Sequence, residues 1–229
     1  MTKTETEKRL EALAADVLET WRPDHAGKVE IATILCEKGH ANQKRKFSDE
    51  PYANHPKRVA AMAKQAYYSE GRAEDGRLAE LVALCHDLLE DSSISAETLK
   101  TSLGQDVAEP VAHLTKPCGK ERFPPEPRKP RKTHEFHRLA TVPPLAQSVK
   151  LCDVIDNLRS FEQAASANRK WAETYLTEKE NLAALLADAL PPLKTQAAEA
   201  IEKAKKSLGQ KALPRKKNKH GLQETDGIH

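Results

Sequence analysis

Apolar residues recur at every third or fourth position along most of this chain, the pattern of amphipathic α-helices that share a core. Strand-like alternation is nearly absent. We therefore predict an all-α fold, a bundle of about eight to ten helices. The predicted helices cover residues 4–21, 28–42, 56–68, 77–91, 95–103, 107–115, 169–190 and 193–208, with one more that starts at Pro143-Pro144.

A chain of 229 residues suits one domain followed by a tail. We predict a domain over residues 1–205 and a basic, mobile tail over residues 206–229, because apolar periodicity ends there and lysines and arginines gather. Residues 116–132 also lose the periodicity and contain five prolines and seven lysines or arginines. Helical patterns resume on both sides, so this stretch is predicted to be a loop within the domain.

Composition excludes several classes of function. No apolar run reaches the ~18 residues of a membrane span, and the N-terminus lacks the apolar core of a signal peptide. The net charge of +3 is too small to indicate nucleic-acid binding, and the basic residues do not alternate with aromatic ones. The four cysteines are far apart, which suits reduced thiols. We expect a cytoplasmic protein; the sequence leaves its oligomeric state open.

The stretch Leu84–Asp91 places four polar side chains in an otherwise apolar run. In a helix, His86 and Glu90 stack on adjoining turns, and so do Asp87 and Asp91. Acidic groups at the C-terminal end of a helix are unfavourable by roughly 0.3–1 kcal/mol each. A broken local rule of this kind often marks a functional site. The alternative interpretation is a solvated acidic helix end with a core histidine.

A second histidine can join this group. His55 precedes Pro56, and proline favours the first helical position, so His55 is predicted at the N-terminus of a helix. Two imidazoles with two carboxylates suit Mn, Fe or Zn. Such a metal would activate water and polarise a phosphoryl oxygen, while Glu90 and Asp91 orient the water or carry protons. The proposed ligands are His55, His86, Asp87 and Asp153.

Basic and amide side chains supply candidates for phosphate contacts. Arg45 and Lys46 follow the second predicted helix, and Lys150 lies three residues before Asp153 on the same helix face as Asn157. Arginine binds phosphate through two parallel hydrogen bonds, and lysine acts as a point charge. Without further context, a solvated surface position is the more common outcome for each of these basic side chains, and a surface or capping position for the amide of Asn157.

Four linked motifs resemble the HD-superfamily hydrolases of the RelA/SpoT type, in particular the small stand-alone enzymes of that family. Their order and spacing match over residues 30–160. The motifs are His40-x-x-Gln43-x-Arg45-Lys46, Pro51-Tyr52-x-x-His55-Pro56, His86-Asp87-x-x-Glu90-Asp91 and Lys150-Leu151-x-Asp153-x-x-x-Asn157-Leu158-Arg159.

The resemblance implies an HD-domain helical bundle with one Mn(II) ion on the four proposed ligands. It implies hydrolysis of the 3′-pyrophosphate of guanosine tetra- or pentaphosphate (ppGpp, pppGpp) to GDP or GTP and pyrophosphate. Glu90 and Asp91 match the family's acidic catalytic pair. Residues that match or suit its nucleotide site are Arg45, Lys46, Lys150, Asn157 and Tyr175.

Three features depart from the family pattern and bear on the substrate: Phe47, Trp171 and the proline-rich stretch 116–132. Relatives also act on adenosine alarmones, remove the 2′-phosphate of NADPH, or serve as antitoxins against toxic synthetases. A phosphohydrolase for another nucleotide is therefore one alternative. A non-catalytic nucleotide-sensing module is another, although such a module would not need Glu90 and Asp91.

Overall fold

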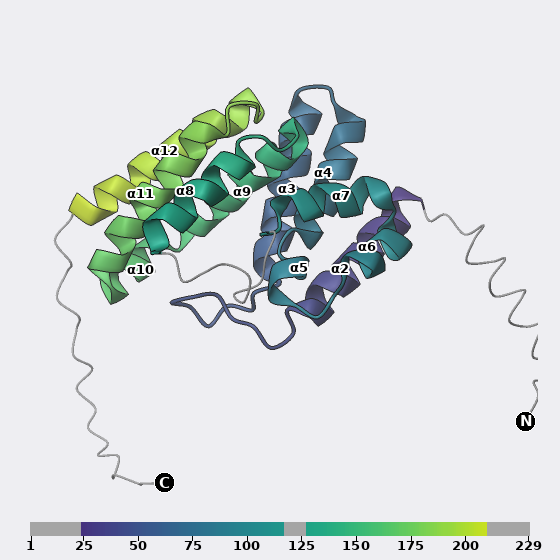
Figure 1. The fold of residues 1–229 in the computed structure, drawn as a ribbon, viewed down its shortest axis with the longest axis horizontal. Helices are drawn as coiled ribbons and strands as arrows, with labels where there is room; N and C mark the ends of the chain where they lie inside the picture. Colours follow the sequence, from purple (N-terminus) through teal and green to yellow (C-terminus); the bar gives the residue numbers. More distant parts are fainter. Residues whose placement is uncertain (1–23, 117–126, 210–229) are drawn as a thin grey trace, which may run out of the picture.

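The computed structural model describes residues 24–116 and 127–209, and the regular elements in these ranges are all helices (Figure 1). The prediction of an all-α fold is confirmed. The helices are α2 (His25–Gly39), α3 (Asn54–Ser69), α4 (Ala73–Cys85), α5 (Leu88–Asp91), α6 (Ala96–Leu103), α7 (Gln105–Leu114), α8 (Arg128–Leu139), α9 (Pro144–Arg159), α10 (Phe161–Ala167), α11 (Arg169–Leu185) and α12 (Pro191–Gly209). Within the described ranges, none of them has the length and apolar character needed to cross a membrane.

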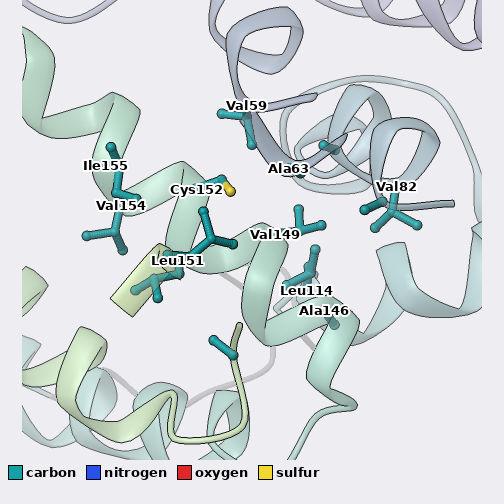
Figure 2. Packing of buried hydrophobic residues seen from close by; sticks show 14 of the residues in the cluster. Val59, Ala63, Val82, Leu114, Ala146, Val149, Leu151, Cys152, Val154 and Ile155 are labelled. Atoms are coloured by element: carbon teal, nitrogen blue, oxygen red, sulfur yellow. The ribbon is translucent and has the colours of Figure 1, made fainter. Parts of the chain in front are cut away.

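Helix α9 is the central element of the bundle. It packs against α3, α4, α7, α10, α11 and α12. Pro144 opens it, where the missing N–H of proline costs no hydrogen bond. Figure 2 shows Val149 and Cys152 of α9 directed toward Val59 and Ala63 of α3, and all four are fully buried. The small side chain of Ala63 lets the two helices approach closely, which brings the polar residues of α9 next to the first turn of α3.

The prediction of one continuous helix over residues 77–91 is wrong, because the structure has two helices there. Helix α4 ends at Cys85, and α5 restarts at Leu88. The Nδ1 atom of His86 hydrogen-bonds to the carbonyl oxygen of Ala83 at 2.7 Å, so a side chain competes for a backbone acceptor of the last turn. His86 and Asp87 therefore stand in a turn between two helices, where apolar periodicity gives no signal.

Other boundaries also differ from the prediction. Residues 128–132 belong to α8 and not to a loop; Pro130 lies in its first turn, where backbone N–H groups need no partner within the helix. The short helix α10 was not predicted. The second helix begins at His25, because Asp24 caps it through the N–H of Gly27 at 2.8 Å. Helix α12 continues to Gly209, past the predicted domain boundary at residue 205. The predicted helix 4–21 and most of the predicted tail lie outside the described residues.

Candidate metal centre and nucleotide site

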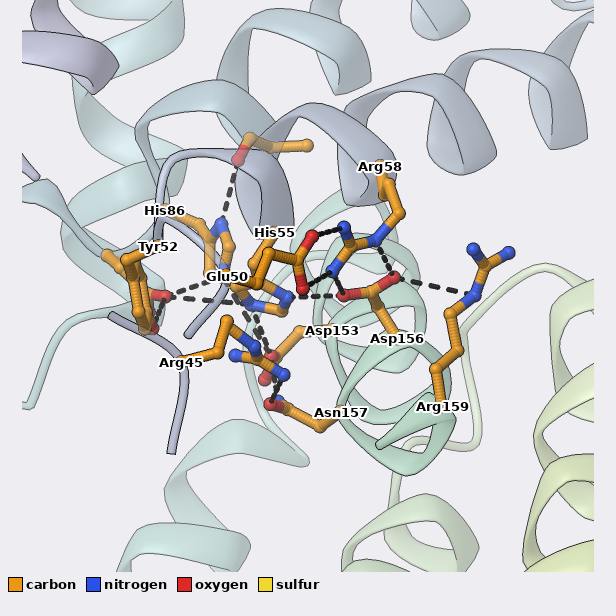
Figure 3. Close-up of polar contacts among 12 residues, drawn as sticks. Arg45, Glu50, Tyr52, His55, Arg58, His86, Asp153, Asp156, Asn157 and Arg159 are labelled. Atoms are coloured by element: carbon orange, nitrogen blue, oxygen red, sulfur yellow. Dashed lines mark hydrogen bonds and ion pairs between the residues drawn. The ribbon is translucent and has the colours of Figure 1, made fainter. Parts of the chain in front are cut away.

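Three helical segments bring together two imidazoles and a carboxylate in the middle of the bundle (Figure 3). His55 comes from the first turn of α3, His86 from the turn after α4, and Asp153 from α9. One ligand atom of each lies within 4.8 Å of the others, and all three residues are buried. The Nε2 atom of His55 is 3.2 Å from Oδ1 of Asp153, and that of His86 is 3.9 Å from the same oxygen.

His55 is oriented by Asp156, which lies one turn beyond Asp153 on α9. Nδ1 of His55 donates to Oδ2 of Asp156 at 2.7 Å. Arg58 in turn donates to both oxygens of Asp156, at 2.7 and 3.0 Å, and also binds Glu50. A carboxylate can only accept here, so the proton resides on Nδ1 and the lone pair of Nε2 faces the cluster. This hydrogen bond from the far ring nitrogen is the usual arrangement of a metal-binding histidine.

A backbone carbonyl fixes the orientation of His86 in the same way, with Nε2 directed toward the cluster. Because the Ala83 oxygen can only accept, Nδ1 of His86 carries the proton and Nε2 faces Asp87 at 3.1 Å. Burial alone would lower the pKa of His86, but the charges of Asp87 and Asp153 outweigh it and raise the pKa to about 9. Both Nε2 atoms are buried and make no hydrogen bond within the part of the chain that the structure describes. Two buried Nε2 atoms beside carboxylates fit a divalent cation, which would take the place of the proton on His86.

Asp87 lies at the edge of this cluster. Its Oδ2 atom is 3.7 Å from Nε2 of His55 and accepts a 2.6 Å hydrogen bond from the hydroxyl of Tyr52. Tyr52 in turn packs against the His40 ring, with 4.8 Å between ring centroids. The structure therefore places Asp87 beside both imidazoles but outside the compact group of His55, His86 and Asp153, and the hydroxyl of Tyr52 holds it there.

Asp153 connects the cluster to the cations of the site. Its Oδ2 atom is 2.9 Å from Nζ of Lys150, while Oδ1 accepts from the amide nitrogen of Asn157. The Asn157 oxygen accepts from Nη2 of Arg45 at 2.9 Å. Burial would raise the pKa of Asp153, but Lys150, followed by Lys179 and His55, holds it well below its usual range. Asp153 therefore remains a carboxylate, as a metal ligand must.

The two acidic residues of α5 have different surroundings. Glu90 accepts two hydrogen bonds from Lys116, from the backbone N–H at 2.8 Å and from Nζ at 2.6 Å. The pKa of Asp91 is raised, first by partial burial and then by the charges of Asp87 and Glu90. The backbone carbonyl of Asp91 accepts from the side chain of Gln43 at 2.5 Å, which fixes the end of α5. The raised pKa suits Asp91 to take up a proton.

Three aromatic side chains, Phe47, Trp171 and Tyr175, form a cluster that contacts the ammonium groups of Lys46 and Lys179. Trp171 stacks on Tyr175, with ring centroids 4.6 Å apart and 18° between the planes, and Phe47 meets Trp171 edge-on at 5.2 Å. The ammonium group of Lys46 lies 4.0 Å from the centroid of Trp171, and that of Lys179 lies 5.1 Å from the centroid of Tyr175. Phe47 adopts φ = 65°, which is strained for a residue with a side chain. The departures at Phe47 and Trp171 therefore belong to one cluster.

Sequence reasoning missed three residues of the site, Arg58, Asp156 and Lys179, and assigned no role to Tyr52, which stands in the second of the four motifs. Asp156 had a detectable signal, since it follows Asp153 by three residues on a helix. Lys179 had none, because α11 reaches the site only through the packing of the bundle.

The family model described as "HD domain" matches residues 32–190. The chain belongs to the HD domain family. Among curated relatives, this HD-domain protein is 32% identical over 153 residues to a guanosine-3′,5′-bis(diphosphate) 3′-pyrophosphohydrolase of Aquifex aeolicus, covering 65% of this chain but only 20% of the relative. It is 30% identical over 156 residues to the pyrophosphohydrolase MESH1 of Xenopus tropicalis, covering 68% of this chain and 79% of the relative.

The fold of this HD-domain protein also matches a solved structure. That protein is described as a metazoan ortholog of SpoT that hydrolyzes ppGpp and plays a role in starvation responses. The TM-score is 0.65 at 23% identity, and the match covers 80% of this chain and 98% of the other. At this identity the match shows the fold. The chain spans about a fifth of the Aquifex relative's length, so that relative's whole activity does not transfer directly.

Proposed function

We propose that this HD-domain protein is a Mn(II)-dependent hydrolase that removes the 3′-pyrophosphate of ppGpp or pppGpp. The observation that carries the proposal is the pair of buried imidazoles whose Nδ1 protons are committed elsewhere and whose Nε2 atoms meet at Asp153. Around this centre, Arg45 and Lys150 supply positive charge for a phosphorylated substrate. The two curated relatives, each at 30% identity or above, carry the same activity in their names.

His55, His86, Asp87 and Asp153 would hold a single ion. When bound, it would lower the pKa of a water molecule and polarise the phosphoryl oxygen. Asp156 and the Ala83 carbonyl keep both imidazoles in the tautomer that presents Nε2, and Tyr52 fixes Asp87. These contacts preorganise the ligands before the substrate arrives.

In the proposed reaction, water attacks the phosphorus atom attached to O3′, and the P–O3′ bond breaks. The water loses a proton, O3′ gains one, and the products are GDP or GTP and pyrophosphate. Asp91, whose pKa is raised, is proposed to accept the proton, and Glu90 to orient the water. Arg45, Lys46 and Lys150 would bind the phosphates, while Asn157 and Tyr175 would contact the nucleoside.

The test is an assay of the purified protein with Mn(II) against ppGpp, its adenosine analogue and the dinucleotide NADPH. Pyrophosphate release from ppGpp, abolished in His86→Ala, is the expected result. Faster removal of phosphate from NADPH, with ppGpp left intact, would assign the site to the alternative substrate. Binding of ppGpp without turnover of any of the three would assign it to the non-catalytic sensor.

A further inference from the structure

The rings of Phe47 and Trp171 form an aromatic corner to which the proposed reaction assigns no role. Phe47 comes from the loop between α2 and α3, and Trp171 from the first turn of α11. The two rings meet edge-on, with 61° between their planes, and Tyr175 stacks on the Trp171 ring. Both residues of the corner are partly exposed. The aromatic corner therefore presents ring surface to solvent beside the cations of the site.

The backbone holds Phe47 in this position against a steric cost. Phe47 is the third residue of a tight turn, which the N–H of Ser48 closes on the carbonyl of Arg45 at 3.2 Å. With φ = 65° it lies in the left-handed region, where glycine or asparagine is usual and a bulky side chain is strained. Strained residues of this kind collect at ligand sites. The strain therefore favours a functional role for the Phe47 ring.

The ammonium group of Lys46 lies in the aromatic corner, 4.0 Å from the ring centroid of Trp171 and 5.1 Å from that of Phe47. Lys46 is exposed, and a cation–π contact at an exposed site is weak. A nucleobase that stacks on an aromatic ring gains more than such a contact, and phosphate attracts an ammonium group by a charge-assisted hydrogen bond. A nucleotide therefore draws Lys46 to its phosphates while its base takes the place on the rings.

The position of the aromatic corner relative to the metal centre suits a nucleotide. In the loop, Arg45 lies two residues before Phe47 and binds Asn157 of α9. On α11, Lys179 follows Trp171 by two turns, about 12 Å, and its charge helps to hold the pKa of Asp153 below its usual range. One nucleotide can therefore place its base at the aromatic corner and its phosphates among the cations.

We propose that Phe47 and Trp171 form a stacking site for the purine base of the substrate, which accepts guanine and adenine alike. The inference rests on the proposed function, because it assigns the base end of the same nucleotide site. Stacking tolerates different bases, since each has a π-face. A two-ring purine covers more of the indole than a pyrimidine does. The substrate class is then purine nucleotides, bound through their phosphates by the cations and through their base by ring contact.

Isothermal titration calorimetry of the full chain with GDP, ADP, UDP and inorganic pyrophosphate tests the stacking site. None of the three nucleotides carries a 3′-pyrophosphate to be hydrolysed. The wild-type protein should bind GDP and ADP with affinities within about threefold of each other, and UDP more weakly. Trp171→Leu should weaken the binding of both purine nucleotides by about tenfold or more. It should leave the affinity for pyrophosphate within about twofold, because pyrophosphate has no base to stack.

Two further variants make the test specific. Tyr68→Leu is the matched control, because it removes an exposed aromatic ring that lies beside Lys64 of α3. It should leave the binding of all four ligands unchanged. Phe47→Gly removes the other ring of the corner, and glycine accepts the positive φ, so the turn is kept. It should also weaken GDP and ADP but not pyrophosphate, and it decides the matter if circular dichroism shows that Trp171→Leu is unfolded.

Four results would overturn the stacking site. They are no binding of GDP or ADP to the wild-type protein, purine binding unchanged in both Trp171→Leu and Phe47→Gly, equal loss of purine nucleotide and pyrophosphate, and GDP bound more than tenfold tighter than ADP. Pyrophosphate release from ppGpp is measured separately. Release that persists while purine binding ignores Trp171 would remove the stacking site and keep the proposed function. Purine binding that depends on Trp171, without any release, would do the reverse.

Discussion

His55 and Asp156 form a buried hydrogen bond of 2.7 Å that fixes which nitrogen of the imidazole faces the metal centre. Both side chains are fully inaccessible to solvent, and Arg58 neutralises the carboxylate from the other side. Asp156 thus orients the proposed ligand His55 without being a ligand itself. Such partners of metal-binding histidines are usually worth about 10–100-fold in metal affinity.

Replacing Asp156 by Asn should therefore weaken Mn(II) binding about 10–100-fold, because the amide can present its N–H₂ group to His55 and oppose the required tautomer. Calorimetric titration with Mn(II) measures the effect. Asp75→Asn, which removes the same charge from an exposed pair with Arg72, is the control and should bind Mn(II) as the wild type does. Unchanged affinity in Asp156→Asn would remove Asp156 from its orienting role.

Mn(II) binding should release a proton from His86. The pKa of His86 is raised to about 9, so the metal-free site carries this proton at neutral pH, and the ion must displace it from Nε2. The affinity should increase with pH by up to about tenfold per unit below pH 9 and level off above it. Titrations at pH 7 in buffers of different ionisation enthalpy should show close to one proton released. An affinity that is flat between pH 6 and pH 8 would contradict the raised pKa.

Glu90→Gln and Asp91→Asn should lower turnover of the substrate while Mn(II) content is retained, because neither side chain is one of the four proposed ligands. Losing a group that transfers protons or positions water typically costs about 10²–10⁴-fold. The larger loss is expected for Asp91→Asn, since Glu90 is partly engaged by Lys116. Single-turnover kinetics with metal analysis separates the roles. Loss of metal in either variant would place that residue among the ligands.

Arg45→Ala should raise KM at least as much as it lowers kcat, because a phosphate contact acts on the bound substrate as well as on the transition state. Arg45 is buried and tied to Asn157, whereas its neighbour Lys44 is exposed and paired with Asp49. Lys44→Ala is therefore the control and should leave both constants unchanged. Equal effects of the two substitutions would mean that charge on this loop matters and the position of Arg45 does not.

Gly39→Ala should destabilise the protein by about 1–3 kcal/mol, the usual cost of overfilling a packed core. A methyl group there would come within 2.5 Å of the buried Leu88 side chain, at the start of α5. Turnover should fall too, because α5 carries Glu90 and Asp91. Urea unfolding measures the stability, with Gly209→Ala as the control, since nothing lies within 4 Å of its added methyl group. Stability equal to the wild type would show that Leu88 moves aside freely.

The sequence by itself determined the helical class and supplied the candidate residues of the proposed metal centre. Apolar spacing of three and four is a local property that survives any packing arrangement, so α3, α6 and α7 were predicted close to their observed bounds, and α9 close to its observed start. His55 beside Pro56, and Lys150, Asp153 and Asn157 on one helix face, followed from the same local rules. The spacing of the motifs indicated the family.

Only the tertiary structure decided how these residues meet. The break at His86 and Asp87 depends on a side chain that takes the Ala83 carbonyl, which no periodicity reveals. Lys179 joins the site because α11 packs against α9, and contacts between residues distant in sequence carry no local signal. The tautomers of His55 and His86 were likewise decided by partners that folding supplies, and those tautomers suit the two histidines to the proposed role of metal ligands.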